Sequence, residues 1–279
     1  MTEQTSGLPK TRIPSPKDSP TIRWGVIAPG GIAHAFASAV NNETPSCISA
    51  VGSRSIERAK EFANKFNKDS EVRAYGSYEE LVLDEEIDAV YVASPHSEHL
   101  AHVSLALNAG KPVLVEKAFT QNAKQARQIV ELARAKNLLL VEAMWTRFLP
   151  HIDVVRQIVE SGELGEIEVI IADHGQAMNF PPEHRLQNPA LAGGALLDMG
   201  IYPLSFMHMV LGIPDSFNAV ATITKTGVDE TLSATLKWKS AHGVLNTSQK
   251  VKTPTTATIS GPKARIEIPH NFYQPNEVH

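Results

Sequence analysis

The sequence predicts an α/β fold in two parts. A doubly wound parallel sheet over residues 21–142 is followed, over residues 143–279, by an α+β domain with a large, mostly antiparallel open sheet. Up to about Glu142, short continuous apolar runs alternate with amphipathic stretches, which is typical of parallel strands covered on both faces. Beyond Leu211, strand-like runs follow one another without intervening helices, which indicates an antiparallel sheet.

The first domain alternates five predicted strands with helices. The strands are Ile22–Ala28, Cys47–Val51, Ala89–Ala93, Val113–Val115 and Leu138–Val141. A first helix follows the turn after Ala28, and the later helices are Ser55–Phe66, Ser77–Leu83, His99–Asn108 and Ala123–Ala135. Gly110 and Pro112 end the helix before them, because glycine suits the left-handed position after a helix and proline cannot continue it.

The second domain begins with a helix over Ile152–Glu160 that stops near Gly162, and a strand over Glu166–Ala172 follows. After a proline-rich loop, a helix runs from about Gly194 to Leu211. The remaining predicted strands are Ala219–Thr224, Thr231–Trp238, Gly243–Lys250, Thr256–Ser260 and Ala264–Ile268.

Composition indicates an ordinary soluble globular chain of 279 residues, 42% hydrophobic and 20% charged, with no metal site. A net charge of −4 gives no reason to expect nucleic acid or a membrane surface as a partner. No apolar run approaches the roughly 18 residues that span a bilayer, and no signal peptide opens the chain. The one cysteine, Cys47, excludes an intrachain disulfide, so we expect a cytoplasmic protein. Residues 1–20 are polar and rich in proline, which predicts a mobile arm.

A short turn between the first strand and the first helix indicates dinucleotide binding. The three small-residue positions of the G-x-G-x-x-G/A fingerprint hold Ala28, Gly30 and Ala33, and Gly31 and Ile32 lie between the last two. Such a turn presents backbone N–H groups to a pyrophosphate. Ala28 replaces the first glycine and is tolerable there if its φ stays below zero. A plain strand–turn–helix connection is the alternative.

The residues after the second strand favour NADP over NAD. Ser53 and Arg54 follow that strand, and Arg58 lies one helical turn further on. A hydroxyl and a guanidinium suit a ribose 2′-phosphate, whereas NAD sites place an acidic residue there. Alternatively, Ser53 or Ser55 caps the next helix and Arg54 is a surface charge; the two roles are compatible.

Two further strand ends carry polar residues at the same predicted edge of the sheet. Ser94, Pro95, His96 and His99 are expected under the nicotinamide ribose, with Ser97 capping the next helix. A zinc site is disfavoured, because this loop offers one carboxylate and no cysteine.

Glu116 and Lys117 end another strand. The lysine can donate to a substrate hydroxyl and lower the pKa of a neighbouring acid, unless it is only a surface residue.

The second domain carries its own candidates. Asp198 and Tyr202 lie four residues apart and so project from one helix face, where a structural Asp–Tyr hydrogen bond is the alternative to function. Gly200 between them permits close approach to another element. Trp145 and Arg147 could wall the nicotinamide pocket or serve interdomain packing, and Arg185, with His184, is a candidate for substrate selection.

The glycine turn, Glu116-Lys117-Ala118 and the helix from Asp198 to Tyr202 together resemble the Gfo/Idh/MocA oxidoreductases. The similarity is greatest to the branch of dihydrodiol dehydrogenase and NADP-dependent D-xylose dehydrogenase. The resemblance implies a Rossmann domain, dimerisation through the open sheet, and chemistry on a sugar or cyclic diol. It also implies that Lys117 and Tyr202 transfer the proton while Asp198 orients substrate or lysine.

The predicted function is therefore hydride transfer between NADP and a sugar or cyclic vicinal diol. Two departures from the family pattern bear on it: Ala118 stands where the family has proline, and the chain ends at His279, earlier than the family usually does, so a missing C-terminal element would weaken the dimer. A non-catalytic NADP-binding sensor on the same scaffold is the alternative. A transferase or lyase that keeps its nucleotide bound is a third possibility.

Overall fold

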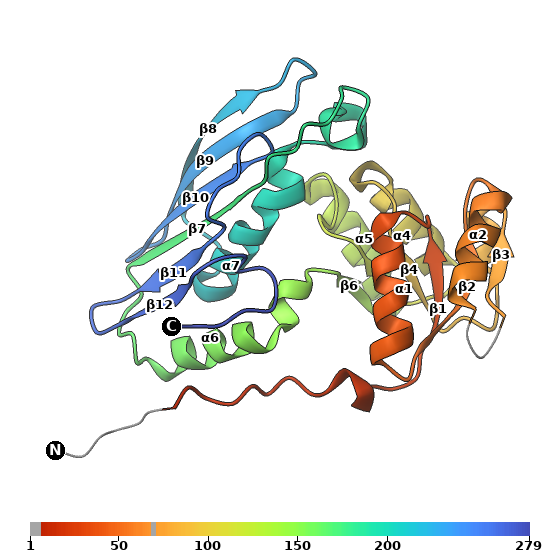
Figure 1. The fold of residues 1–279 in the computed structure, drawn as a ribbon, viewed down its shortest axis with the longest axis horizontal. Helices are drawn as coiled ribbons and strands as arrows, with labels where there is room; N and C mark the ends of the chain where they lie inside the picture. Colours follow the sequence, from red (N-terminus) through yellow and green to blue (C-terminus); the bar gives the residue numbers. More distant parts are fainter. Residues whose placement is uncertain (1–6, 68–70) are drawn as a thin grey trace. The chain divides into compact units, whose positions relative to one another are not determined.

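The computed structural model describes residues 7–67 and 71–279, and the chain divides into two compact units. One unit comprises residues 14–143, here called the nucleotide unit. The other combines residues 7–13 with residues 144–279, here called the sheet unit. Figure 1 shows the course of the chain through both.

The nucleotide unit is built on a six-stranded parallel sheet in the order β3-β2-β1-β4-β5-β6, which confirms the predicted doubly wound fold. Its strands are β1 (Arg23–Ile27), β2 (Cys47–Gly52), β3 (Arg73–Tyr75), β4 (Ala89–Val92), β5 (Val113–Val115) and β6 (Leu140–Glu142). The sequence analysis missed β3. That strand has three half-buried residues, too few to form an apolar run.

Helices cover both faces of this sheet. On one face, α1 (Gly31–Glu43) and α2 (Ile56–Phe66) pack Ala33, Ala37 and Phe62 against buried strand residues. On the other, α3 (Tyr78–Val82), α4 (His99–Asn108) and α5 (Ala123–Ala135) do the same with Leu81, Leu107 and Ile129. Gly110 has φ +80 after α4, the left-handed stop that the sequence predicts.

The sheet unit contains six strands in the order β12-β11-β7-β10-β9-β8, all antiparallel neighbours except the parallel pair β7 and β10. The mostly antiparallel open sheet is thus confirmed. The strands are β7 (Val169–Gly175), β8 (Ser216–Ile223), β9 (Asp229–Lys237), β10 (His242–Ser248), β11 (Ala257–Ser260) and β12 (Arg265–Ile268).

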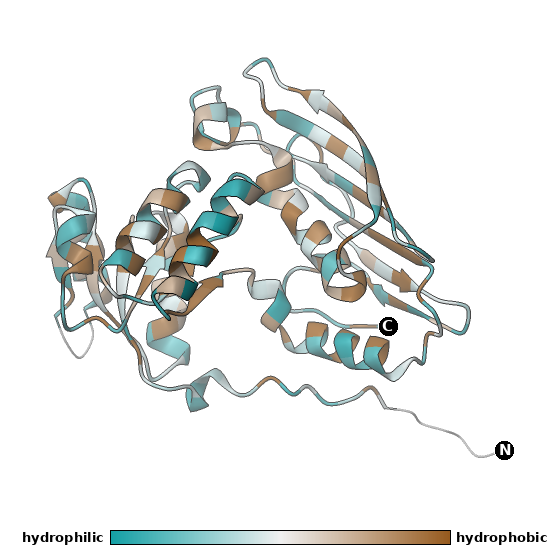
Figure 2. Ribbon diagram, turned by 180° about the vertical axis from the view of Figure 1, so that it is seen from behind, coloured by the Kyte–Doolittle hydropathy of each residue, from teal (hydrophilic) through white to brown (hydrophobic). Residues whose placement is uncertain are grey.

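Two helices pack on this sheet. The first is α6 (Pro150–Ser161), which Gly162 ends with φ +74. The second starts with a π-helical turn, Leu196–Gly200, and continues as α7 (Ile201–Leu211). Most side chains of α7 are apolar, as Figure 2 shows, and Phe206 and Met207 reach the core around Ile170.

One segment of the described chain, Pro189–Leu211, is long and apolar enough to cross a membrane by length and composition alone. The sequence analysis overlooked it because polar residues such as Asp198 interrupt the run. More than half of its most apolar window, 56%, is buried inside the protein, as in the core helix of a soluble domain.

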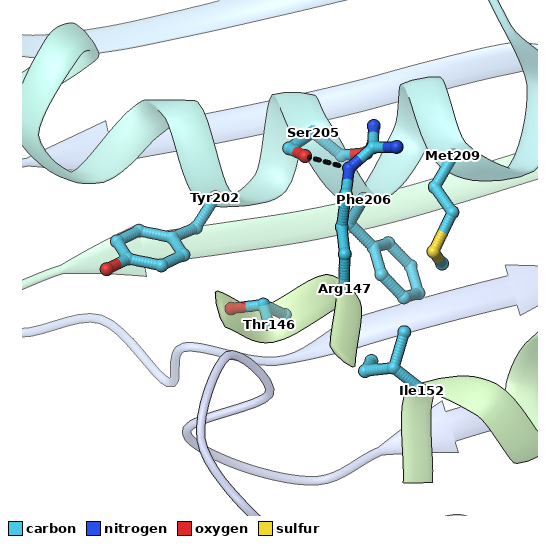
Figure 3. Close-up of a pocket in the computed structure, with 7 residues that line it drawn as sticks. All are labelled: Thr146, Arg147, Ile152, Tyr202, Ser205, Phe206 and Met209. Atoms are coloured by element: carbon cyan, nitrogen blue, oxygen red, sulfur yellow. Dashed lines mark hydrogen bonds between the residues drawn. The ribbon is translucent and has the colours of Figure 1, made fainter. Parts of the chain in front are cut away.

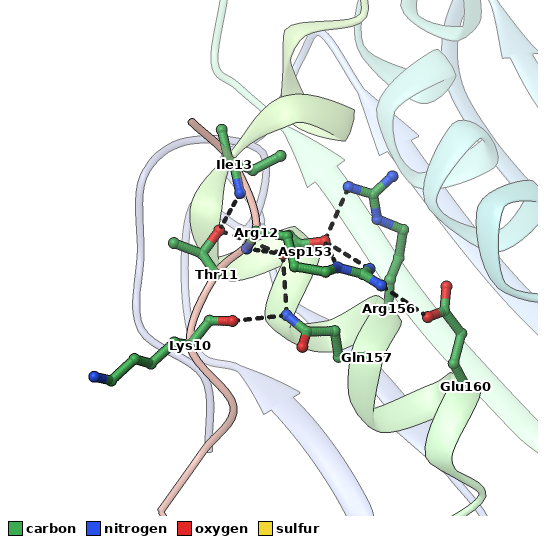
Figure 4. Close-up of polar contacts among 8 residues, drawn as sticks. All are labelled: Lys10, Thr11, Arg12, Ile13, Asp153, Arg156, Gln157 and Glu160. Atoms are coloured by element: carbon green, nitrogen blue, oxygen red, sulfur yellow. Dashed lines mark hydrogen bonds and ion pairs between the residues drawn. The ribbon is translucent and has the colours of Figure 1, made fainter. Parts of the chain in front are cut away.

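Part of the N-terminal segment is anchored to α6 (Figure 4). The carboxylate of Asp153 accepts hydrogen bonds from the backbone N–H of Arg12 at 2.6 Å and from its guanidinium at 2.8 and 3.0 Å. Gln157 bonds both Asp153 and the carbonyl of Lys10. This anchor lies within the segment predicted as a mobile arm, where ion pairs such as those of Arg12 leave no periodic pattern in the sequence.

Candidate functional site

The turn between β1 and α1 forms an open cradle of backbone groups. Gly30 is the N-cap of α1 and no side chain caps it, so the first N–H groups of the helix point out of the turn. A Cβ added at Gly30 or Gly31 would meet no protein atom within 4 Å. Space and donors together suit an anion such as a pyrophosphate.

Ala28 corrects one expectation. Its φ is +66, in the left-handed region, and not below zero as the sequence analysis requires. The bond from the N–H of Gly30 to the carbonyl of Ala28, at 2.8 Å, closes the turn in this conformation. This left-handed conformation costs a non-glycine residue about 1 kcal/mol. At the other end of the motif, Ala33 is fully buried and Ile32 is half exposed.

Two guanidinium groups lie at the end of β2. Ser55 caps α2 by accepting the N–H of Arg58, and Ser53 is buried beside it. Arg54 and Arg58 are exposed, and both act on the hydroxyl of Tyr78: burial raises the pKa of Tyr78, and the two positive charges oppose that shift. This edge therefore offers two cations to a ligand phosphate.

Tyr78 and His102 complete this corner, and the sequence analysis missed both. Their rings meet edge to face with centroids 4.6 Å apart, and His102 Nδ1 lies 2.9 Å from Ser94 Oγ. Burial lowers the pKa of His102. Tyr78 follows the unpredicted β3, so no motif pointed to it.

The loop after β4 lies against the loop after β5. His96 Nε2 lies 3.1 Å from the carbonyl oxygen of Lys117, and both ring nitrogens of His99 face backbone carbonyls. His99 has no exposed surface, so a direct cofactor contact is not supported. Ser97 does not cap α4, because its hydroxyl donates to Glu98. Ser94 is buried, and Pro95 precedes the short turn His96–Glu98.

The strand end that carries Lys117 is held by acidic side chains. Glu116 accepts the hydroxyl of Tyr91 at 2.5 Å and the backbone N–H of Lys117 at 3.2 Å. Glu142, at the end of β6, accepts the N–H of Phe119 at 2.8 Å. Lys117 and Ala118 are joined by a cis peptide bond where the family pattern has proline.

In the sheet unit, Asp198 and Tyr202 each have a bonded partner. Arg185 donates to Asp198 at 3.2 Å, which ties the proline-rich loop to the π-helical turn. The indole N–H of Trp145 donates to the phenol oxygen of Tyr202 at 3.2 Å. π-helical turns are frequent at functional sites.

Aromatic and polar groups surround Tyr202, and the sequence analysis missed them. The ring of Tyr273 lies 4.9 Å and that of His174 5.4 Å from the Tyr202 ring, and these two rings stack on each other. Gln176 donates to the hydroxyl of Tyr273. His174 and Gln176 lie two residues apart at the end of β7, a spacing that gives only a weak signal in the sequence. Tyr273 lies in a C-terminal segment that has no recognisable pattern.

Two packing contacts fix the helix that carries these residues. Asp229, from β9, accepts the N–H of Leu196 at 2.6 Å and so caps the helix start. A Cβ at Gly200 would meet Thr247 Cγ2 at 2.9 Å. The close approach expected at Gly200 is therefore contact with β10.

Arg147 is engaged within the sheet unit. Its guanidinium donates to the hydroxyl of Ser205 at 2.9 Å and to the carbonyl of the same residue at 3.2 Å. Figure 3 shows this bond beside a small pocket, with the phenol of Tyr202 pointing away from Arg147. The pocket is too small for a sugar, and these bonds offer no support for a cofactor contact by Arg147.

The predicted site residues thus form one group within each unit. At the carboxyl ends of the parallel strands the nucleotide unit brings together the glycine turn, Arg54, His96 and Lys117. The sheet unit joins Trp145 to Tyr202, and Arg185 to Asp198. Among the described residues no group of three or more His, Cys, Asp or Glu side chains could hold a metal ion.

Both units match known families. Residues 22–143 match the family described as "Oxidoreductase family, NAD-binding Rossmann fold". Residues 152–267 match the "GFO/IDH/MocA C-terminal domain".

Alignments with known relatives extend over most of the chain. The D-xylose 1-dehydrogenase (NADP(+)) of Hypocrea jecorina is 37% identical over 91% of this chain and 74% of its own length. The trans-1,2-dihydrobenzene-1,2-diol dehydrogenase of Mus musculus is 38% identical over 92% of this chain and 77% of its own length.

Solved structures agree with the fold. KijD10, a 3-ketoreductase from Actinomadura kijaniata in complex with TDP-benzene and NADP, superposes with a TM-score of 0.81 at 29% identity, over 93% of this chain and 80% of that one. An aldose-aldose oxidoreductase from Caulobacter crescentus, complexed with glycerol, gives a TM-score of 0.83 at 25% identity over the same shares.

Proposed function

The chain belongs to the Gfo/Idh/MocA oxidoreductase family, and from this premise we propose that it is an NADP-dependent dehydrogenase of a sugar or cyclic vicinal diol. The substrate class follows the relatives, which are named for D-xylose and for a trans-dihydrodiol. The hydrogen bond from Trp145 to Tyr202 is the observation that carries the catalytic part of the proposal. Through it the indole N–H donates to the phenol oxygen of a buried tyrosine, one helical turn from Asp198.

The residues of the nucleotide unit fit NADP. The Gly30–Gly31 cradle leaves room that a Cβ would fill, and N–H groups of α1 face it. Arg54 and Arg58 supply positive charge for a 2′-phosphate. Bound NADP would supply the hydride acceptor for the carbinol carbon.

The protein's own part is to move one proton and hold the substrate. Tyr202 takes the proton of the substrate hydroxyl during oxidation and returns it in the reverse reaction. The N–H of Trp145 stabilises the phenolate of Tyr202. The part proposed for Lys117 is to donate to a substrate hydroxyl. Asp198, oriented by Arg185, holds a second substrate hydroxyl.

An activity panel tests this function. The protein is mixed with NADP or NAD and with D-xylose, other aldoses and trans-dihydrodiols, and the near-ultraviolet absorbance of reduced nicotinamide is followed. We expect reduction of NADP with at least one substrate of these classes. Cofactor binding by thermal shift without any reduction would favour the non-catalytic sensor, for which the relatives give no support.

Homodimerisation through the open sheet is part of the proposal. One face of that sheet exposes Ile171, Val220 and Val244 among serine, threonine and asparagine side chains. A flat face of this kind suits a second copy of the chain, because both partners bring the same apolar side chains. We further propose a cytoplasmic location, in keeping with the single free cysteine, Cys47.

A further inference from the structure

His99 is the first residue of α4 and has no exposed surface. Its Nδ1 lies 2.9 Å from the carbonyl oxygen of Ala118 and 3.3 Å from that of Phe119. Its Nε2 lies 2.9 Å from the carbonyl oxygen of Ser94. Both ring nitrogens are therefore at hydrogen-bond distance from groups that can only accept.

This arrangement favours one protonation state of the ring. A neutral imidazole carries one N–H and one bare nitrogen, and only the N–H could donate. The bare nitrogen would then face a carbonyl lone pair at 2.9 Å on whichever side it lay. A doubly protonated ring donates on both sides, so each of the facing carbonyls accepts a hydrogen bond from it.

The loops that His99 joins carry both acidic and basic side chains. Two carboxylates belong to the loops that His99 joins, since Glu116 ends β5 and Glu142 bonds the N–H of Phe119. The other titratable groups around it are His96, Glu98, His102 and Lys117. Burial lowers the pKa of His102, and its electrostatic interaction with His99 acts in the same direction.

We propose that His99 is a buried imidazolium that fixes the Lys117 loop to the end of β4, and is thus a positioning residue of the reaction. It touches neither substrate nor cofactor. Through the Ala118 and Phe119 carbonyls it sets the backbone that follows Lys117, and through Ser94 it ties that backbone to a second strand end. The positioning role rests on the proposed catalytic function of Lys117, whereas the protonation state does not.

The protonation state is measured directly by NMR of the full-length chain labelled with [15N]histidine. We expect one of the eleven histidines to keep protons on both ring nitrogens at pH 8, and the His99→Gln variant to lose that resonance pair. His151 is the internal comparison, because it is buried and its Nε2 has one carbonyl partner, Phe272; burial lowers its pKa, so it should be neutral. If no histidine of the unsubstituted protein is doubly protonated at pH 8, the proposal is overturned, whether or not the variant folds.

Kinetics test the positioning role. His99→Gln keeps a donor for one carbonyl only, and a displaced Lys117 should lower kcat by about 10- to 100-fold while KM for NADP changes less. The midpoint of the His102 titration should rise in the same variant, because a neighbouring positive charge is gone. His151→Gln, the same change at a buried histidine of the sheet unit, should leave kcat unchanged. Unaltered kcat in His99→Gln would refute positioning, and an inactive unsubstituted protein would instead refute the proposed function.

Discussion

At the scale of single residues, glycine can be needed in the nucleotide turn for two reasons: a positive φ, or space beside the backbone for a ligand. Ala28 adopts φ +66 although alanine is disfavoured there, so backbone conformation does not dictate the residue at this position. Gly30 has φ −85, which any residue tolerates, yet the space beside it is open. The proposed pyrophosphate, lying close to the turn, would give a reason for glycine at this position that the fold itself does not.

A substitution at Gly30 tests this directly. Gly30→Ala should change the free energy of unfolding by less than about 1 kcal/mol, because a Cβ there meets nothing, and the poorer N-cap of alanine opposes the freedom that the unfolded chain loses. The same Cβ should weaken NADP binding at least tenfold, measured by calorimetry. Gly76→Ala is the control, since its Cβ would meet only Ile56 at 3.8 Å. Unchanged NADP affinity in Gly30→Ala would exclude this turn as the pyrophosphate site.

Cofactor preference is also decided by single residues. Replacing both Arg54 and Arg58 by alanine removes the two cations at the end of β2. Each charge-assisted bond to a phosphate is worth roughly 1.5–3 kcal/mol, so kcat/KM for NADP should fall by 10-fold or more while that for NAD changes little. Equal losses for the two cofactors would show that these arginines do not read the 2′-phosphate.

At the scale of elements, the sequence predicts long periodic segments best. The bounds of α4 and α5 agree with the structure because amphipathic spacing and strong stops define them. β3 escaped prediction because three half-buried residues carry no pattern. For the candidate site too, only residues within a local motif could be predicted from the sequence, such as Lys117 and Tyr202. His174 and Tyr273 come close to Tyr202 only through tertiary packing, which the sequence does not show.

The contribution of the N-terminal anchor to stability should depend on pH. The bonds from Arg12 lower the pKa of Asp153 to about 2. A carboxylate with a depressed pKa stabilises the fold above its ordinary value near 4, and this stability is lost as pH falls toward 2. Because Arg12 is about half exposed, solvent screens the ion pair, and we expect a contribution smaller than the full shift of the Asp153 pKa implies.

Thermal unfolding as a function of pH measures this anchor. Asp153→Asn should lower the Tm at pH 7, and its difference from the unsubstituted protein should shrink toward pH 2. Glu160→Gln removes only the exposed partner of Arg12 and serves as the control with little effect. A difference in Tm for Asp153→Asn that stays constant with pH would show that the carboxylate charge is not what stabilises the anchor.

At the scale of the whole molecule, the proposed dimer uses one face of the open sheet. Val220 and Val244 lie on that face, and Phe217 lies on the opposite face of β8 and is also exposed. Light scattering after gel filtration should give about twice the 30.3 kDa chain mass for the unsubstituted protein. Val220→Glu combined with Val244→Lys should give monomers, and Phe217→Glu should remain dimeric. A monomeric unsubstituted protein would end the proposal of a dimer.

The central claim is that Tyr202 exchanges the substrate proton in an NADP-dependent dehydrogenase. The most direct measurement is kcat for NADP reduction by Tyr202→Phe, on whichever aldose or diol the unsubstituted protein oxidises, with NADP affinity measured in parallel. We expect kcat to fall by roughly 10²- to 10⁴-fold while NADP binds as before, because phenylalanine keeps the ring and loses only the hydroxyl. A kcat within about threefold of the unsubstituted protein would contradict the claim.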